Sequence, residues 1–204
     1  MYVAFEGIDT AGKSTQIERL RDRFDDVLVT REPGGTDLGR RIRTLLLEEG
    51  GAHARAEALL FLADRAEHIE KVVRPNLHRT ILSDRSFVSG VAYARVHEGI
   101  AVDTLIALNR FATGNLFPDT VVLLELDEAT LRARLERKAP DAIERRGIGY
   151  MLEVQKAMKE LTDLLEIDTL VVDASLPPER IADTIEEYLK QRMKTNQATK
   201  EERP

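Results

Sequence analysis

Short runs of apolar and β-branched residues alternate along the chain with longer segments in which apolar residues recur at helical spacing. The short runs are typical of strands, and the longer segments are typical of helices. The pattern predicts strands at Tyr2–Glu6, Val27–Arg31, Thr80–Asp84, Thr120–Leu126 and Leu170–Asp173. It predicts helices at Ser14–Phe24, Asp37–Glu49, Ala54–Leu77, Ser86–Glu98, Val102–Thr113, Glu128–Lys138, Gly149–Leu165 and Pro178–Met193.

The order of these elements predicts an α/β fold. Repeated alternation of strand and helix implies one five-stranded parallel sheet flanked by helices on both faces. The runs VVLLEL and LVVDA are nearly continuous, as expected for strands that are buried on both sides. Because ligands of such sheets bind beyond the carboxyl ends of the strands, the residues that follow each strand are the candidates for chemistry.

Length and composition fit one domain and exclude several classes of protein. The chain has 204 residues and no Pro-, Gly- or Ser-rich linker, so we expect one domain over residues 1–193 and a disordered polar tail over 194–204. The net charge of −6 argues against a general affinity for nucleic acid. The absence of cysteine excludes disulfides and zinc–thiolate sites. No apolar run has membrane-spanning length, so we expect a cytoplasmic protein.

The first predicted strand leads directly into a phosphate-binding loop (P-loop). The segment G-I-D-T-A-G-K-S matches G-x-x-x-x-G-K-[ST] between a strand and a helix, which is the context that this motif requires. Its glycines let backbone N–H groups face phosphate oxygens, Lys13 is suited to the β- and γ-phosphates, and Ser14 is suited to Mg²⁺. The candidate ATP-binding residues are Gly7, Ile8, Asp9, Thr10, Ala11, Gly12, Lys13, Ser14 and Thr15. The loop by itself does not separate a kinase from a switch GTPase or a motor ATPase.

The second and third strands also end in candidate site residues. The second ends in T-R-E-P-G-G-T, in which the glycines fit a simple turn but Arg31 and Glu32 at the strand end are not explained by it. The third ends in S-D-R-S. Asp84 stands where P-loop enzymes hold Mg²⁺, and Arg85 could grip an oxyanion with its guanidinium fork or lie in solvent.

Three further features have both a functional and a structural interpretation. Phe61 and Arg65 share one helix face, where they could stack on a base and bind its edge, although core packing of Phe61 is the commoner outcome. The basic run over residues 132–146 fits a mobile lid or a solvated helix end. The histidines His53, His68, His78 and His97 form no metal-binding spacing, so surface or helix roles suffice for them.

Four motifs, taken together, resemble the thymidylate kinase (dTMP kinase) family. They are F-E-G-I-D-x-A-G-K-S-T, T-R-E-P-G-G-T, L-L-F-x-A-D-R and S-D-R-x-x-x-S-G-V-A-Y, in this order. The resemblance implies the nucleoside monophosphate kinase type of P-loop NTPase fold with a helical lid, over about residues 132–149. It also implies transfer of the γ-phosphoryl group of ATP to dTMP with Mg²⁺, giving dTDP for dTTP synthesis, by an enzyme that is usually a homodimer.

The resemblance also implies roles for individual residues. Phe61 would stack on thymine, Arg65 would reach the base edge, and Arg85 would clamp the dTMP phosphate. Tyr93 beneath the sugar would disfavour a ribose 2′-hydroxyl. The implied substrate-binding residues are Asp9, Glu32, Pro33, Phe61, Arg65, Arg85, Ser89, Gly90 and Tyr93; the catalytic residues are Lys13, Asp9, Arg85, Arg134 and Arg137; and the metal-binding residues are Ser14 and Asp84.

The chain departs from the family pattern at two positions. Members without a P-loop arginine use lid arginines, which fits Thr10 and Ala11 here. The lid motif D-R-[IFY]-E, however, has Ala142 in place of its arginine, so Arg145 or Arg146 would have to compensate. Gly90 also stands where other members place Asn or Thr.

Two rival functions stay open on the sequence. One is a kinase for a different acceptor on the same scaffold, although Arg85 beside the acceptor favours a phosphorylated substrate. The other is a nucleotide switch or binding module without catalysis. A guanine-specific switch would normally carry N-K-x-D after a later strand, and V-V-L-L-E-L-D-E lacks it.

Overall fold

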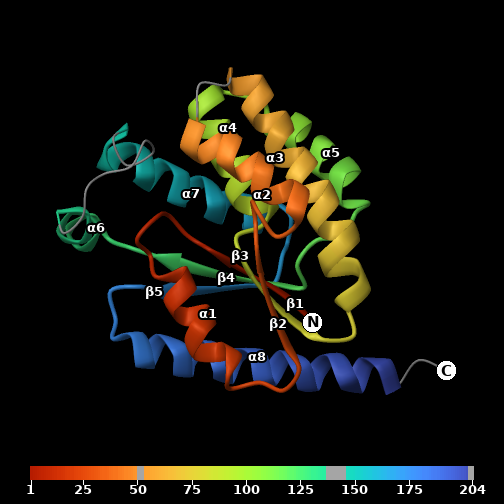
Figure 1. Ribbon diagram of the computed structural model, residues 1–204. Coiled ribbons are helices and arrows are strands. Elements are labelled where there is room, and N and C mark those ends of the chain that lie inside the picture. Colours follow the sequence, from red (N-terminus) through yellow and green to blue (C-terminus); the bar gives the residue numbers. More distant parts are fainter. Residues whose placement is uncertain (50–52, 137–145, 202–204) are drawn as a thin grey trace.

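The protein is built on one parallel sheet (Figure 1). A computed structural model describes residues 1–49, 53–136 and 146–201. The sheet has five strands in the order β2-β3-β1-β4-β5, so the predicted α/β class is confirmed. The strands are β1 (Tyr2–Glu6), β2 (Val27–Arg31), β3 (Thr80–Asp84), β4 (Thr120–Glu125) and β5 (Thr169–Asp173).

Helices cover both faces of the sheet. Figure 1 shows α1 and α8 against one face, and α2, α3, α4, α5 and α7 over the other. Their bounds are α1 (Lys13–Arg21), α2 (Asp37–Thr44), α3 (Ala54–His68), α4 (Phe87–Glu98), α5 (Val102–Thr113), α6 (Glu128–Leu135), α7 (Ile148–Leu164) and α8 (Pro178–Glu201). π-helical segments continue α2 over Leu45–Glu49 and α3 over Ile69–Val73, and a 3-10 turn follows at Arg74–Asn76.

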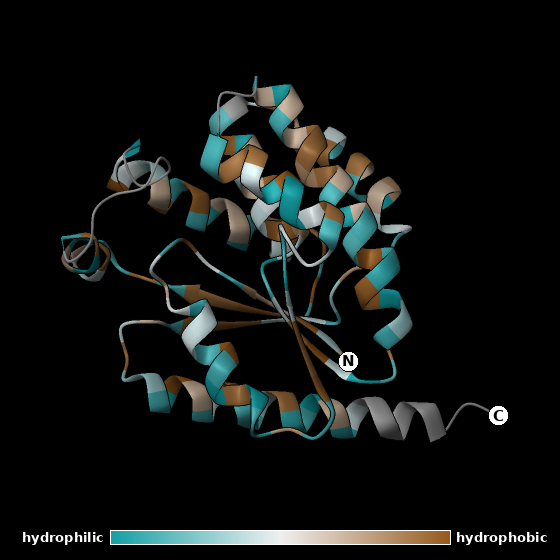
Figure 2. Ribbon diagram, in the orientation of Figure 1, coloured by the Kyte–Doolittle hydropathy of each residue, from teal (hydrophilic) through white to brown (hydrophobic). Residues whose placement is uncertain are grey.

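The core lies around the central strands. Every residue of β1 is buried, as is β4 up to Leu124, and both strands are surrounded by the apolar faces of the helices (Figure 2). We expected β5 to be buried on both sides, which is wrong. It is an edge strand, where the helices cover the faces of the sheet less fully than at its centre, and Val171 is 40% exposed.

The predicted helix bounds differ from the structure at several ends. The predicted helix Ala54–Leu77 is regular only to His68, before the π-helical segment and the turn that contains Pro75. We also predicted that the last helix ends at Met193, which is wrong. It continues to Glu201, into the tail that we expected to be disordered, because residues 194–201 contain neither Gly nor Pro and little else that opposes a helix. Within the described ranges, no helix combines the length and the apolarity needed to cross a bilayer.

Candidate active site

The P-loop connects β1 to α1. Gly7 has φ 142°, and a Cβ there would lie 2.6 Å from the Leu124 carbonyl oxygen, so only glycine fits. The Lys13 ammonium folds back over the loop and donates to the carbonyl oxygens of Gly7 and Ile8, both at 3.0 Å. Burial and the nearby Arg85 guanidinium lower the pKa of Lys13 to about 8. The loop thus holds the Lys13 ammonium against two of its own backbone carbonyl groups.

The predicted metal residues meet at the mouth of this loop. The Ser14 hydroxyl donates to Asp84 Oδ2 at 2.8 Å. The two residues are 70 positions apart, but β1 and β3 are neighbours in the sheet and pair Phe5 with Asp84. A hydroxyl and a carboxylate therefore stand side by side where a phosphate-bound cation would need oxygen ligands.

Arg85 lies next to the P-loop and brings together several predicted residues. Its guanidinium donates to the Gly7 carbonyl at 3.1 Å, to Ser89 Oγ at 2.8 Å and to Asp9 Oδ1 at 2.5 Å. It also lies over the Tyr93 ring, 5.6 Å from its centroid. Arg85 adopts a left-handed backbone conformation, φ 73°, which is uncommon for a residue with a Cβ and is concentrated at functional sites.

The Tyr93 hydroxyl contributes a polar atom to this cluster. It is buried and has no hydrogen-bond partner among the residues that the structure describes. Burial raises the pKa of Tyr93, so the phenol stays protonated and can donate. A buried donor beside an arginine is an arrangement that suits a polar ligand.

Glu6 is a site residue to which the sequence reasoning assigned no role. It is fully buried at the end of β1, and its Oε1 accepts from the Ser86 amide and hydroxyl, both at 2.7 Å. Its Oε2 accepts from the Ser89 hydroxyl, which in turn accepts from Arg85. Burial raises the pKa of the Glu6 carboxyl. Glu6 thereby fixes the turn that carries Arg85, and an acid at the end of a wholly apolar strand was the signal that could have found it.

A second cluster surrounds Arg65 on α3. Arg65 is 3% exposed, and its guanidinium donates to Glu32 Oε2 at 2.8 Å, to Asn109 Oδ1 at 2.7 Å and to the Ser86 carbonyl at 3.2 Å. A Cβ on Gly90 would approach the Arg65 guanidinium to 2.9 Å. The structure therefore brings Glu32, Arg65 and Gly90 together, and the missing side chain at Gly90 is what makes room for the arginine.

Phe61 lies one turn before Arg65 on the same helix. It is half-buried and is not among the side chains that form or pack against the hydrophobic core clusters of the described chain. The core interpretation of Phe61 is therefore not supported.

His68 is the last residue of α3, but it does not have the surface role that we considered for it. It is fully buried, with Nδ1 2.8 Å from Glu32 Oε1 and Nε2 2.7 Å from Thr30 Oγ1. Burial alone would raise the pKa of Glu32, but Arg65 and His68 hold it below its usual value, so Glu32 is a carboxylate.

The segment R-E-P-G-G-T forms a tight loop between β2 and α2. The Glu32–Pro33 peptide bond is cis, and the Gly34 amide donates to Asp64 Oδ1 at 2.9 Å. Arg43 on α2 donates to the Pro33 carbonyl at 3.1 Å. Burial, together with Arg31, lowers the pKa of Arg43, whose charge also acts on Asp84 and Arg85. Arg43 is thus a further cation of the site that the sequence did not single out.

The lid can be followed at its two ends. Arg134 on α6 donates to the Thr10 carbonyl at 2.7 Å and to the Ala174 carbonyl at 2.5 Å, so it joins α6 to the P-loop and to the end of β5. Arg146 donates to the Tyr150 hydroxyl at 3.0 Å, and the Tyr150 ring lies 6.4 Å from that of Tyr93. The central part of the predicted lid, residues 137–145, with Arg137, Ala142 and Arg145, lies outside the described residues.

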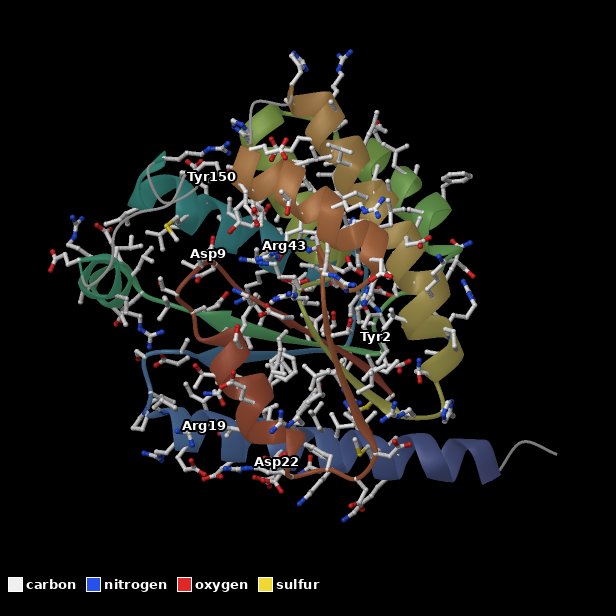
Figure 3. The ribbon with its side chains drawn as sticks, in the orientation of Figure 1. Tyr2, Asp9, Arg19, Asp22, Arg43 and Tyr150 are labelled. Atoms are coloured by element: carbon white, nitrogen blue, oxygen red, sulfur yellow. The ribbon has the colours of Figure 1, made fainter. Side chains whose placement is uncertain are left out.

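The clusters share one side of the molecule. Figure 3 shows Asp9, Arg43 and Tyr150 on the α2–α7 side of the sheet, whereas Arg19 and Asp22 lie on the opposite side, beside α8. A P-loop beside an acid and an arginine from the end of the neighbouring strand, with a second buried arginine nearby, places the protein in the class of P-loop phosphotransferases.

Comparison with known proteins identifies the family within this class. The family model described as thymidylate kinase matches residues 5–185. The thymidylate kinase of Sulfurimonas denitrificans is 51% identical over 175 residues, which cover 86% of this chain and 92% of the relative. That of Aliarcobacter butzleri is 50% identical over 189 residues, covering 93% and 98%. That of Helicobacter hepaticus is 45% identical over 194 residues, covering 93% and 98%. The chain belongs to the thymidylate kinase family, as its motifs predicted, and its phosphoryl donor is ATP.

Asp64, which holds the R-E-P-G-G-T loop, generates a pH-dependent prediction. Burial raises the pKa of Asp64 from 3.8 to about 6. The folded protein therefore keeps the proton of the Asp64 carboxyl to a higher pH than the unfolded chain does. The contribution of this protonated carboxyl to the stability of the fold is complete below pH ~4 and is lost as the pH rises through ~6. Relative to Asp64→Asn, we expect the free energy of unfolding of the wild type to fall by up to about 3 kcal/mol between these limits.

Urea unfolding of the wild type and of Asp64→Asn across this pH range measures the difference between their free energies of unfolding. Asparagine keeps an oxygen that can accept from the Gly34 amide, so the comparison isolates the titration. A difference between the two proteins that stays constant with pH would contradict the raised pKa.

Proposed function

We propose that this protein transfers the γ-phosphoryl group of ATP to dTMP, giving ADP and dTDP, and thereby supplies a precursor of dTTP. The observation that carries the proposal is the position of Arg85, whose guanidinium contacts both the P-loop carbonyl of Gly7 and the Asp9 carboxylate. A fixed cation beside the P-loop suits an acceptor that itself carries a phosphate. The relatives named thymidylate kinase support dTMP as that acceptor.

On the donor side, the P-loop residues 7–15 bind the triphosphate. Their backbone N–H groups and the amino-terminal end of α1 face the phosphate oxygens, and Lys13 bridges the β- and γ-phosphates. Asp9 lies in the P-loop, which binds ATP, and forms an ion pair with Arg85, which binds dTMP. It therefore lies between the two nucleotides.

Magnesium fits this site. The Ser14 hydroxyl and the Asp84 carboxylate lie 2.8 Å apart, and hard oxygen ligands of this kind suit Mg²⁺. They would hold the ion, directly or through water, while phosphate oxygens complete its ligands. The bound ion would neutralise charge on the phosphates of ATP.

On the acceptor side, each residue of the two clusters has a part. Arg85 holds the dTMP phosphate, with Ser89 and Asp9 fixing the guanidinium. Phe61 stacks on thymine and Arg65 binds the base edge, in a space that Gly90 leaves open. Tyr93 lies beneath the sugar, and Glu32 and Pro33 shape the pocket wall.

The chemistry then depends on position and charge rather than on a general base. The phosphate of dTMP is an anionic nucleophile at neutral pH, and one of its oxygens attacks the γ-phosphorus in line with the departing ADP. Lys13, Arg85 and the lid arginines, Arg134 and Arg137, neutralise the charge of the transferred group in a site closed to water. Because Arg134 also holds the Thr10 carbonyl, it ties the lid to the P-loop.

We further propose a cytoplasmic homodimer with no nucleic-acid or membrane partner. The packed helices α3 and α5 expose apolar side chains, with Leu59 60% and Phe111 87% exposed. An exposed phenylalanine on such a pair favours a protein contact. The nucleotide substrates favour a cytoplasmic location, which cell fractionation tests.

A coupled assay of ADP release tests the proposed activity. With ATP and Mg²⁺, we expect dTMP to be turned over selectively within a panel that also contains dUMP, UMP, dCMP, dGMP and thymidine. Lys13→Ala and Arg85→Ala should each lower kcat/KM by at least about 100-fold, because each removes a charge that compensates the transferred group.

Circular dichroism provides the folding control for these variants. Selective turnover of another acceptor would refute dTMP as the substrate, and silence across the panel would support the binding-module alternative. Near-normal turnover in either folded variant would refute the assigned roles.

The stacking role of Phe61 has its own kinetic signature. In Phe61→Ala we expect the KM for dTMP to rise by roughly 10- to 100-fold with little change in kcat, because base–aromatic stacking contributes equally to ground and transition states. Steady-state kinetics with each nucleotide varied in turn measures this. The KM for ATP is the internal control, and an unchanged KM for dTMP would contradict stacking.

The proposed dimer contact is tested by mass in solution. Light scattering after size exclusion should give twice the chain mass of 23.0 kDa for the wild type. Phe111→Asp should give the single-chain mass, because a charge would be buried in an apolar contact. Leu164→Asp, at an apolar position on α7 that is 61% exposed, is the matched control and should stay dimeric. A dimeric Phe111→Asp would exclude this contact.

A further inference from the structure

A continuous buried hydrogen-bond network runs through Arg65, the arginine to which we assign the base edge of the acceptor. It starts at Thr30 on β2, passes through His68, Glu32 and Arg65, and ends at Asn109 on α5. All five side chains are 9% exposed or less. Glu32 and Arg65 take part in the proposed reaction, whereas Thr30, His68 and Asn109 have no part in it so far.

The Glu32 carboxylate is held from two sides. Arg65 Nε donates to Oε2 and His68 Nδ1 lies at Oε1, both at 2.8 Å. Because a carboxylate can only accept, His68 Nδ1 must carry a proton. His68 Nε2 is in turn 2.7 Å from the Thr30 hydroxyl, so both ring nitrogens are engaged and the ring cannot rotate without losing a bond.

Arg65 is held from its other end by Asn109. The Asn109 Oδ1 accepts from Arg65 at 2.7 Å, and its own amide nitrogen donates to the Leu105 carbonyl at 2.7 Å, which fixes the orientation of the amide. With the Ser86 carbonyl, three N–H groups of Arg65 have protein acceptors. A guanidinium has five such groups, so one on each terminal nitrogen is left for a ligand.

We propose that His68 is a positioning residue for pyrimidine selection: by fixing Glu32 it holds Arg65 in place, so that a base carbonyl is accepted and a base amino group is rejected. This inference rests on the proposed function. Arginine has donors and no acceptor, so it pairs with the O4 carbonyl of thymine and opposes the amino group of cytosine. A guanidinium that could rotate away would lose much of this discrimination, whereas a fixed one keeps it.

An alanine substitution cannot separate this role from packing. The His68 ring also contacts Gly35, where a Cβ would lie 2.5 Å from its Cδ2, so removal of the ring would loosen the R-E-P-G-G-T loop. Two polar substitutions separate the roles. The side-chain amide of asparagine reaches the position of Nδ1 and keeps a donor for Glu32, whereas that of glutamine reaches the position of Nε2 and keeps only the bond to Thr30.

The experiment compares His68→Asn, His68→Gln and the wild type in KM, kcat and the ratio of kcat/KM for dTMP to that for dCMP. In His68→Gln we expect a rise of roughly tenfold in the KM for dTMP and a similar fall in the ratio, with kcat within about twofold, since a buried carboxylate oxygen loses its partner. His68→Asn should stay within about threefold of the wild type in both quantities.

Two further variants complete the design. Thr162→Val on α7 removes an equally buried hydroxyl that bonds the Lys159 carbonyl, far along the chain from the network, and should leave KM and the ratio unchanged. Asn109→Ala releases Arg65 from the opposite end, so it should lower the ratio even if neither His68 variant folds.

The outcomes separate the inference from the function on which it rests. Equal shifts in His68→Asn and His68→Gln, or an unchanged ratio in a folded His68→Gln, would overturn the positioning role of His68, and an unchanged ratio in Asn109→Ala would overturn the need for a fixed Arg65. Turnover of dTMP by the wild type would uphold the function in each of these cases. A wild type that does not phosphorylate dTMP would overturn both.

Discussion

Parallel hydrogen bonding between β1 and β3 aligns Phe5 with Asp84, and the rest of the site depends on this register. Because of it, the P-loop and the turn at Arg85 leave the sheet at the same edge. The Ser14–Asp84 and Asp9–Arg85 contacts join residues that are 70 and 76 positions apart. A shift of one position would move each side chain to the opposite face of the sheet. The buried apolar side chains of β1 and β3 therefore determine the geometry of a polar site at the end of those strands.

Polar groups at the two sides of the site are fixed in the same way. Arg85 is held by Asp9, Ser89 and a backbone carbonyl, and Arg65 is held by Glu32, Asn109 and another carbonyl. In both cases the side chain loses its rotamer freedom during folding rather than on binding. Arginines that are fixed in this way bind a charged or polar partner with a smaller loss of entropy.

The sequence predicted those parts of the fold and site that depend on local patterns. The strands follow from apolar runs, and Lys13 and Ser14 follow from a motif with few chance matches. Glu6, Arg43, His68, Asn109 and Tyr150 escaped prediction because their residue types also occur in solvent, and only tertiary contacts bring them to the site. The half-exposed β5 was misjudged for a related reason, since position in a sheet is set by topology and not by the apolarity of one strand.

Glu6 has a consequence for how this enzyme can change over evolution or in the laboratory. One of its oxygens is satisfied by Ser86 in the turn after β3 and the other by Ser89 in the first turn of α4, although Glu6 itself precedes the P-loop. A P-loop grafted onto another acceptor turn would leave a carboxylate buried without partners, and an acceptor turn grafted without its serines would do the same. The nucleotide-binding and acceptor-binding halves are thus not interchangeable modules: they have to be inherited, or redesigned, as one piece.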